Sequence, residues 1–346
     1  MRRILLWAAH NRWLRDHVPR WRFVRRAVRR FMPGEDMADA LAAADRYRAE
    51  GIRAVFTLLG ENLAAFEDAE AIADHYRQLL GEIDRRRLGA EVSVKLTQLG
   101  FDLDPERTYG LVDDLASRAA AIGSWLWIDM EGSAYVERTI ALYERAKAAH
   151  DNVGLCIQAY LHRTPSDLVR LMSLKPAIRL VKGAYDEPAA IAYRKGPEVD
   201  AAYLAAAADL LKAVADGRAA RAILGTHDLP LIEQSARFAE AHGLDRDRIE
   251  IQMLYGIRAG EQRRLAAEGY NVRALVSYGS YWYPWYVRRL AERPANLMFA
   301  LRQLLPCSSR MASRGSPPTS ETVQLSIGEV AVSGLSSPHR SGSCGR

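Results

Sequence analysis

The chain has 346 residues, enough for one large domain or two small ones with a substantial hydrophobic core. Its 49% hydrophobic and 26% charged residues are ordinary for a globular protein, and no run approaches the ~18 apolar residues that would span a membrane. The three cysteines exclude a disulfide framework and favour a reducing compartment.

The net charge of +6 is concentrated near the N-terminus. Residues 1–30 contain ten arginines and one acid, Asp16, with aromatic residues among them at roughly helical spacing. We interpret residues 1–31 as a basic amphipathic helical arm. Such a helix can lie on an anionic membrane surface, or its tryptophans can pack on the body, and the sequence leaves both open. No nucleic-acid recognition motif accompanies the arm, so we expect no nucleic-acid partner.

From residue 37 onward, the hydrophobic period alternates between that of a helix and that of a strand. The predicted strands are 52–59, 91–97, 125–130, 153–160, 178–181, 221–226, 249–254 and 272–276. The predicted helices are 37–50, 68–88, 105–121, 134–149, 165–174, 200–216, 229–242, 260–268 and 283–292. Alternation of this kind in about 250 residues predicts a closed (β/α)8 TIM-type barrel, an α/β fold. A doubly wound sheet is the competing fold, but no G-x-G-x-x-G motif follows any strand.

The barrel is expected to occupy residues 32–305 as one catalytic domain. Beyond residue 305, Ser, Gly, Pro and Arg dominate and the hydrophobic period is lost. A segment of that composition cannot build a core, so we predict that residues 306–346 form a disordered tail.

One predicted strand carries two cations. Arg179 interrupts the apolar run Ile178–Val181, Lys182 follows it directly, and Tyr185 comes three residues later. A buried guanidinium needs an anionic or hydrogen-bonding partner, and a structural salt bridge would satisfy a lone arginine. Because all three residues gather where a strand meets its loop, we favour an anion-binding or cofactor-binding site.

In a barrel, the residues at the carboxyl ends of the strands surround one site. These ends carry charged and hydrogen-bonding side chains, namely Glu61, Lys95, Gln98, Asp129, Glu131, Gln158, Arg179, Lys182, Thr226, His227, Gln252 and Tyr278. Strands must end in polar loops, so chance would place some of them there. The mixture of acidic and basic groups nevertheless suits a charged ligand better than a solvated rim.

Other kinds of site find less support in the sequence. His227 is not accompanied by a second histidine or a cysteine cluster, so we expect no metal site. The motifs G-x-S-x-G and H-E-x-x-H are absent. Asp129 and Glu131 form a pair of carboxylates, but their spacing alone does not establish acid–base catalysis.

The last predicted helix contains two adjacent arginines, Arg288 and Arg289, after a run of aromatic residues. Both can pair with Glu292 along the helix. Alternatively, the guanidinium groups grip a small carboxylate, with the aromatics as a lid. The sequence leaves these two interpretations open.

Seven short motifs, in order along the chain, resemble those of the proline dehydrogenases, and more narrowly of the monofunctional bacterial form. They are SVKLT (93–97), IDMEG (128–132), QAY (158–160), RLVKGAY (179–185), TH (226–227), QMLYG (252–256) and RRLAE (288–292). The resemblance extends from about residue 30 to residue 305. One such motif would be weak, but the whole set in register is highly specific.

The resemblance implies a barrel that binds FAD non-covalently and oxidises L-proline to Δ1-pyrroline-5-carboxylate, the first step of proline catabolism. A membrane quinone would accept the electrons, and the protein would be cytoplasmic, peripheral on the inner face of the membrane. By position, Asp129 and Arg179 would be catalytic. Proline would be bound by Lys95, Tyr185, Arg288 and Arg289. FAD would be lined by Met130, Gln158, Arg179, Lys182, Gly183, Ala184, Thr226, His227 and Gln252.

Two positions depart from the family pattern. Leu275 and Trp285 each stand where the family tends to have a tyrosine. Both changes keep the carboxylate-binding arginines but leave open hydroxyproline or a bulkier cyclic amine as substrate. The alternative functions are therefore a barrel oxidoreductase for another cyclic amine, or a non-catalytic membrane-associated protein that keeps the scaffold. The intact set of charged site residues argues against the second.

Overall fold

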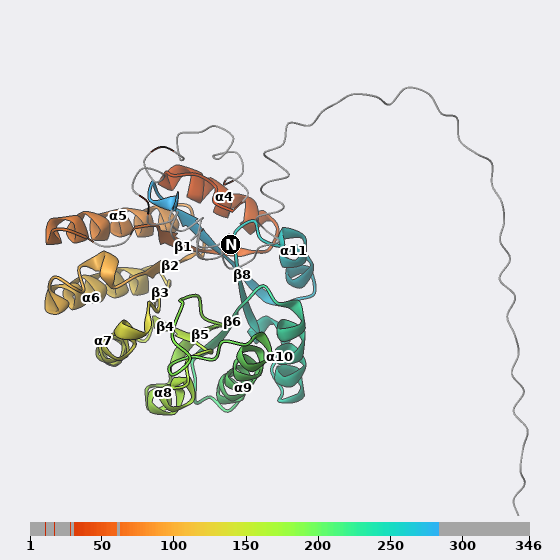
Figure 1. The fold of residues 1–346 in the computed structure, drawn as a ribbon. Helices are drawn as coiled ribbons and strands as arrows, with labels where there is room; N and C mark the ends of the chain where they lie inside the picture. Colours follow the sequence, from red (N-terminus) through yellow and green to blue (C-terminus); the bar gives the residue numbers. More distant parts are fainter. Residues whose placement is uncertain (1–10, 12–16, 18–27, 29–30, 61–62, 284–346) are drawn as a thin grey trace, which may run out of the picture. The chain divides into compact units, whose positions relative to one another are not determined.

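The computed structural model describes residues 11, 17, 28, 31–60 and 63–283. Within them, eight parallel strands form a closed barrel in the order β1 to β8 (Figure 1). The strands are β1 Arg53–Leu58, β2 Glu91–Val94, β3 Leu126–Ile128, β4 Val153–Gln158, β5 Ala177–Val181, β6 Arg221–Gly225, β7 Glu250–Leu254 and β8 Asn271–Tyr278. Pairing of β8 with β1 closes the barrel, so the predicted (β/α)8 fold is confirmed.

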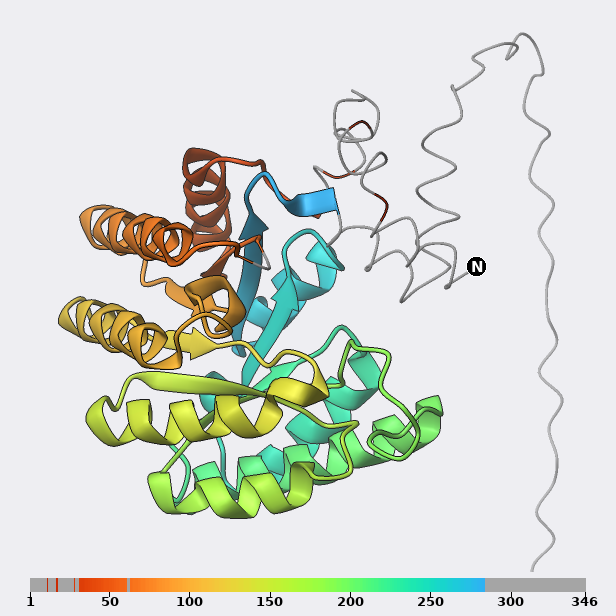
Figure 2. The same cartoon turned by 60° about the vertical axis from the view of Figure 1, so that its left-hand side comes forward.

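Helices surround the strands, as the rotated view shows (Figure 2). They are α4 Met37–Ala49, α5 Phe66–Arg85, α6 Pro105–Ala121, α7 Val136–Ala149, α8 Thr164–Leu171, α9 Gly196–Ala215, α10 Leu229–Ala241 and α11 Ala259–Ala267. Short 3-10 turns are η2 Thr97–Leu99, η3 Ser133–Tyr135, η4 Met172–Leu174 and η5 Arg246–Arg248. Most boundaries agree with the sequence prediction, but α9 begins at Gly196 rather than at Asp200, and β8 continues to Tyr278.

Three predicted segments fall largely or wholly outside the described residues. They are the basic arm at 1–31, the helix at 283–292 and the tail at 306–346. Their predicted structures therefore stay predictions. Among the helices that the structure describes, none is long and apolar enough to cross a membrane.

Local sequence explains where the helices begin, and α6 is a clear case. The side chain of Asp104 accepts hydrogen bonds from the backbone N–H groups of Glu106 and Arg107, both at 3.0 Å. Pro105 follows at the first helical position, where its missing N–H costs nothing. Apolar residues at helical spacing then face the strands, which holds the helix against the barrel.

Alternate residues of each strand point into the barrel, because side chains alternate along a strand. The outward residues, such as Val92 and Leu180, join the main hydrophobic core beneath the helices. The inward residues include a smaller apolar cluster of Val55, Trp127, Ala177 and Ile223, against which Leu275 packs. This cluster separates the two ends of the barrel interior.

Below the apolar cluster, near the amino ends of the strands, lies a network of four largely buried charges, which we call the floor network. Arg221 is 2.8 Å from Glu91 and 2.5 Å from Glu250. Arg273 is 3.1 Å from Glu91 and 3.5 Å from Glu250. The charges of two guanidinium groups and two carboxylates cancel, which offsets the free-energy cost of burying them. The floor network closes the end of the barrel away from the predicted site.

Candidate active site

Asp129, at the carboxyl end of β3, is the centre of a charged cluster inside the barrel. Its Oδ1 accepts hydrogen bonds from Ser93 Oγ at 2.9 Å and from Arg179 Nη2. Its Oδ2 lies 3.4 Å from Lys95 Nζ. Ser93 and Lys95 are two residues apart, so the strand period places both side chains on the inner face. The structure thus brings together Asp129, Arg179 and Lys95, as the sequence predicts.

Arg179 is almost fully buried, at 2% exposure. Its Nη1 donates to Gln252 Oε1 at 2.9 Å and its Nη2 donates to Ser93 Oγ at 2.9 Å. The guanidinium carbon is 5.5 Å from the centre of the Trp127 ring, within reach of a cation–π interaction. Burial, the largest single influence, lowers the pKa of Arg179, but Asp129 together with Cys156 and Glu91 outweighs it, so the pKa is raised. The anionic partner that a buried guanidinium requires is therefore Asp129.

The charge state of Asp129 follows from its neighbours. Burial by itself raises the pKa of Asp129, whereas the Arg179 and Lys95 charges and the Ser93 hydrogen bond lower it. The lowering effects prevail, and the pKa lies below its ordinary value of 3.8. Asp129 is therefore ionised at neutral pH, and the two cations and one carboxylate leave the cluster with an excess positive charge.

Lys95 keeps hydrogen-bonding capacity. An ammonium group has three donors, and within the described part of the chain Lys95 makes one hydrogen bond, the long contact with Asp129. Its side chain is only 17% exposed. A partly desolvated ammonium with spare donors is suited to an anionic ligand.

Glu131 has a different role from Asp129. Its Oε2 accepts from the backbone N–H of Thr97 at 3.1 Å, and its Oε1 accepts from Thr97 Oγ1 at 2.6 Å. Both carboxylate oxygens therefore hold the turn that follows β2. The two carboxylates that the sequence analysis paired therefore have different contacts. Asp129 belongs to the charged cluster, whereas Glu131 links two loops.

Lys182, directly after β5, is paired with two carboxylates. Its Nζ lies 2.5 Å from Asp200 Oδ1 and 2.8 Å from Asp228 Oδ2. Thr226 Oγ1 accepts from the backbone N–H of Asp228 at 3.2 Å. His227 Nε2 accepts from the Leu254 N–H at 3.3 Å. Each of the three residues makes contacts within the protein, although the family resemblance assigns all of them, Lys182, Thr226 and His227, to the cofactor.

The segment after β5 packs closely against Tyr160. Gly183 has φ 121°, and a Cβ there would lie 2.2 Å from the Tyr160 ring, so only glycine fits. The Tyr160 hydroxyl donates to the Tyr185 carbonyl at 3.4 Å. Further along, Glu187 accepts from Ser133 N at 2.7 Å and from Ser133 Oγ at 2.6 Å. These contacts fix the course of the loop that carries Gly183, Ala184 and Tyr185.

Comparison with known proteins places the chain in a family. Residues 40–302 match the family model described as proline dehydrogenase. The chain belongs to the proline dehydrogenase family.

Curated relatives extend the match. Proline dehydrogenase 1 of Bacillus subtilis (strain 168) is 33% identical over 307 residues, covering 88% of this chain and 99% of the relative. Proline dehydrogenase of Deinococcus radiodurans is 35% identical over 281 residues, covering 80% and 89%. A structural neighbour is proline utilization A from Bdellovibrio bacteriovorus inactivated by N-propargylglycine, with a TM-score of 0.71 and 22% identity. That likeness covers 78% of this chain and 33% of the neighbour, and it supports the barrel fold.

Two buried amides mark a polar surface that a proline dehydrogenase could offer to a cofactor. Gln252 uses Oε1 to accept from Arg179, and its Nε2 has no hydrogen-bond partner among the described residues. Gln158 donates to the Glu131 carbonyl at 3.3 Å, and its Oε1 likewise finds no partner in the described part of the chain. A buried polar atom left unpaired costs about 1–3 kcal/mol. One free donor, next to Arg179, and one free acceptor, next to the Glu131 carbonyl, therefore fit a polar ring system.

Tyr278 departs from the expectation that the strand-end residues gather around the site. Its hydroxyl lies 2.8 Å from His75 Nε2, on α5, and its ring packs edge-on against Phe56. Side chains alternate along a strand, and Tyr278 is three residues after the inward-facing Leu275, so its side chain points out of the barrel. Glu61, Arg288 and Arg289 lie outside the described residues.

Sequence reasoning assigned no role to two residues that shape the site. Ser93 lies between Asp129 and Arg179, and Trp127 lies beneath Arg179. Their position on the inner face could have been read from the strand period, because Ser93 precedes Lys95 by two residues and Trp127 precedes Asp129 by two. Their partners depend on the register between strands and have no signal in the sequence.

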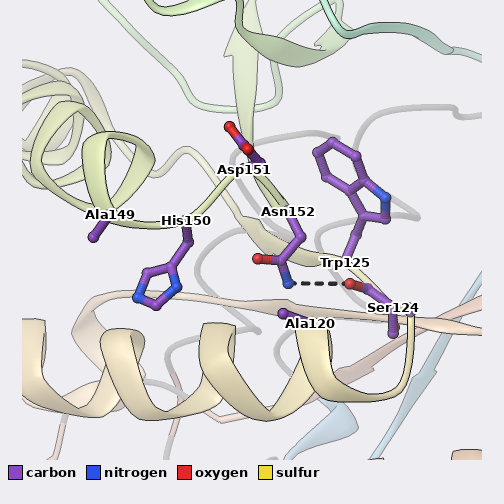
Figure 3. A pocket seen from close by; sticks show the side chains of 8 residues that line it. Ala120, Ser124, Trp125, Ala149, His150, Asp151 and Asn152 are labelled. Carbon is purple, nitrogen blue, oxygen red and sulfur yellow. Dashed lines mark hydrogen bonds between the residues drawn. The ribbon is translucent and has the colours of Figure 1, made fainter.

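A pocket lies elsewhere, between the turns that precede β3 and β4 (Figure 3). Two of its polar side chains are already paired: Asn152 Nδ2 donates to Ser124 O at 3.1 Å, and His150 lies 2.7 Å from Asp113. The pocket is at the amino ends of the strands, away from Asp129. Among the described residues, no cluster of His, Cys, Asp or Glu could hold a metal ion.

Proposed function

We propose that this chain oxidises L-proline to Δ1-pyrroline-5-carboxylate with non-covalently bound FAD, and that a membrane quinone accepts the electrons. Membership of the proline dehydrogenase family supports the reaction. The observation that carries the assignment to this site is the buried cluster of Asp129, Arg179 and Lys95 at the carboxyl ends of the strands. Bound FAD would supply the redox chemistry by accepting two electrons from proline.

The cations of the site would bind the proline carboxylate. Lys95 is held by Asp129 through one long contact and has donors to spare, which suits it to a carboxylate oxygen. Arg288 and Arg289 would add the bidentate grip that guanidinium groups give to carboxylates. Fixing the carboxylate orients the ring, and orientation is the main requirement of a reaction that transfers hydride from proline C5.

The same cations would favour the unprotonated form of the proline amine. The nitrogen must lose its proton before C5 can give up a hydride. An excess of positive charge nearby disfavours a further positive charge on that nitrogen, and so favours the neutral amine. Asp129 would keep Lys95 and Arg179 in place by pairing with both. Tyr185 would pack on the proline ring, from a loop held by Tyr160.

Residues around Arg179 would hold the cofactor. Gln252 and Gln158 would pair their free amide atoms with its polar groups. Arg179 would stabilise the negative charge that arises on reduction, because a preorganised cation in a dry site needs no solvent rearrangement. The remaining cofactor-lining positions would be Met130, Lys182, Gly183, Ala184, Thr226 and His227.

Leu275 makes another cyclic amine a specific alternative to proline as the substrate. Leu275 lies on the inner face of β8 and packs with the apolar cluster around Trp127. The family usually has a tyrosine there, so this chain lacks a hydroxyl near the substrate. A substrate profile over proline, hydroxyproline and larger cyclic amines, at matched flavin content, distinguishes the two candidates by the highest kcat/KM.

The electron acceptor and the basic arm together favour a peripheral position on the inner face of the cytoplasmic membrane. Residues 1–31 would make the contact through arginines and tryptophans. Sedimentation with anionic liposomes tests this. Deletion of residues 1–31 should abolish binding, and unchanged binding would reject the arm as the anchor.

Steady-state oxidation of proline, with trapping of the cyclic imine product, tests the proposed function. Arg289→Met should raise the KM for proline far more than it weakens FAD binding, because Arg289 is assigned to the carboxylate. Arg263→Met is the matched control, since Arg263 is exposed and pairs with Glu50 at 2.7 Å on the outside of the barrel. Equal loss of proline and FAD binding in Arg289→Met would contradict the assignment.

A further inference from the structure

Ser93 occupies the point where the two central charges of the site meet. It is fully buried on the inner face of β2. Its Oγ is 2.9 Å from Asp129 Oδ1 and 2.9 Å from Arg179 Nη2. Asp129 and Arg179 also contact each other directly, so the three groups form a closed triangle of hydrogen bonds.

The direction of each hydrogen bond follows from counting protons. A guanidinium group can only donate and an ionised carboxylate can only accept. Ser93 must therefore accept from Arg179 and give its single proton to Asp129. The carbonyl of Trp127 is the other acceptor within reach, at 3.5 Å, which is a much poorer distance. The hydroxyl thus has one consistent orientation.

The orientation of the Ser93 hydroxyl also determines the contacts that Arg179 makes with its other neighbours. With Nη2 directed to Ser93 and Asp129, Nη1 is directed to Gln252 Oε1. The free Nε2 of Gln252 then faces away from Arg179 as a donor. On the other side, Asp129 Oδ1 is taken by Ser93 and Arg179, which leaves Oδ2 for Lys95. One hydroxyl therefore lies between the residues assigned to substrate and those assigned to cofactor.

We propose that Ser93 is a positioning residue for the oxidation of proline, and that its hydroxyl fixes the mutual orientation of Asp129 and Arg179. This role rests on the proposed function of the site. Ser93 is assigned no contact with substrate or cofactor. It acts by holding Asp129 toward Lys95 and Arg179 toward Gln252.

Removing the hydroxyl leaves the charges but loosens their geometry. In Ser93→Ala, Asp129 still contacts Arg179 and Lys95, so the site keeps its net charge. Asp129 loses one of the hydrogen bonds that lower its pKa, and its pKa rises. The other groups that face Asp129 are Tyr76, from α5, and Cys156, from β4, and neither replaces the lost donor. The loss of kcat/KM at low pH that follows protonation of Asp129, which we call the acid limb, should therefore begin at higher pH.

Kinetics of the FAD-loaded full-length protein test the role of Ser93. Ser93→Ala should lower kcat/KM for proline by about 10- to 100-fold, mostly in kcat, with flavin content unchanged. Ser93→Cys keeps a side chain of similar size with a weaker donor, so it should fall between serine and alanine. This graded order separates a hydrogen-bond effect from a failure to fold, because both variants preserve the packing.

Ser124→Ala is the matched control. Ser124 is also buried, and its hydroxyl donates to the Ala90 carbonyl at 2.7 Å, at the other end of the barrel. It should lower the melting temperature without moving kcat/KM or the acid limb. If Ser124→Ala lost activity as Ser93→Ala does, or if Ser93→Ala stayed within about twofold of wild type with the same acid limb, the role of Ser93 would be overturned. A wild-type protein that does not oxidise proline would instead overturn the proposed function itself.

Discussion

Trp127 packs closely against the backbone of Gly154, and a Cβ at residue 154 would lie 2.4 Å from the indole ring. The indole N–H donates to Glu91 at 2.7 Å, which anchors the ring to the floor network. Arg179 lies over the same ring. The absence of a side chain at residue 154 is therefore what allows a tryptophan to form the surface beneath the charged cluster.

Gly154→Ala should destabilise the protein. The added methyl group overlaps the Trp127 ring, and overpacking of this kind costs about 1–3 kcal/mol. Denaturant unfolding measures the effect. Gly81→Ala is the control, because Gly81 is exposed on α5 and an added Cβ would meet no described atom within 4 Å, so alanine there should stabilise by about 0.5–1 kcal/mol. Equal stabilities of wild type and Gly154→Ala would contradict the close packing of Trp127.

The floor network should be sensitive to the loss of a single charge. Glu91→Gln leaves Arg221 and Arg273 to share Glu250, and breaking a buried pair in this way costs about 3–5 kcal/mol. Urea unfolding gives the free-energy difference. Glu240→Gln, which breaks the solvent-screened pair with Arg246, should lower the stability much less. If Glu91→Gln were as stable as Glu240→Gln, the floor network would contribute no stability.

The fold was accessible from the sequence because it depends on local periodicity. Alternating helix and strand periods predicted the eight strands, and the strand ends located Asp129, Arg179 and Lys95. The floor network was not predicted, because Glu91 and Arg273 come from strands that become close only when the barrel closes. The outward direction of Tyr278 was missed because β8 was predicted to end at residue 276, so its period was not followed to its end.

A link between two loops should affect substrate binding. Glu187 ties the loop that carries Tyr185 to Ser133, beyond the end of β3. Glu187→Ala removes both hydrogen bonds, so Tyr185 should be held less firmly. We expect the KM for proline to rise about threefold to tenfold, which corresponds to about 1 kcal/mol, with kcat changed less. Glu198→Ala is the control, since Glu198 pairs only with the exposed Lys195 in the described structure. If kcat fell while KM stayed constant, the link would have another role.

Stability should depend on pH through His75. Burial lowers the pKa of His75 below its ordinary value of 6.5 in the folded state. Below pH 6.5 the unfolded chain therefore binds this proton more readily than the folded chain, so the contribution of His75 to stability is full above pH 6.5 and is lost as the pH falls. His75→Gln removes the titrating group next to Tyr278. Melting temperatures from about pH 8 to about pH 5 should fall more steeply for wild type than for His75→Gln, and parallel curves would contradict the shift.

The visible spectrum of the purified protein, loaded with FAD, before and after anaerobic addition of L-proline is the most direct test of the assigned chemistry. We expect an oxidised flavin spectrum that bleaches on addition of proline, because the cluster of Asp129, Arg179 and Lys95 orients proline for hydride transfer to the cofactor. A protein that binds no flavin even with added FAD, or a bound flavin that stays oxidised in the presence of proline, would contradict this assignment.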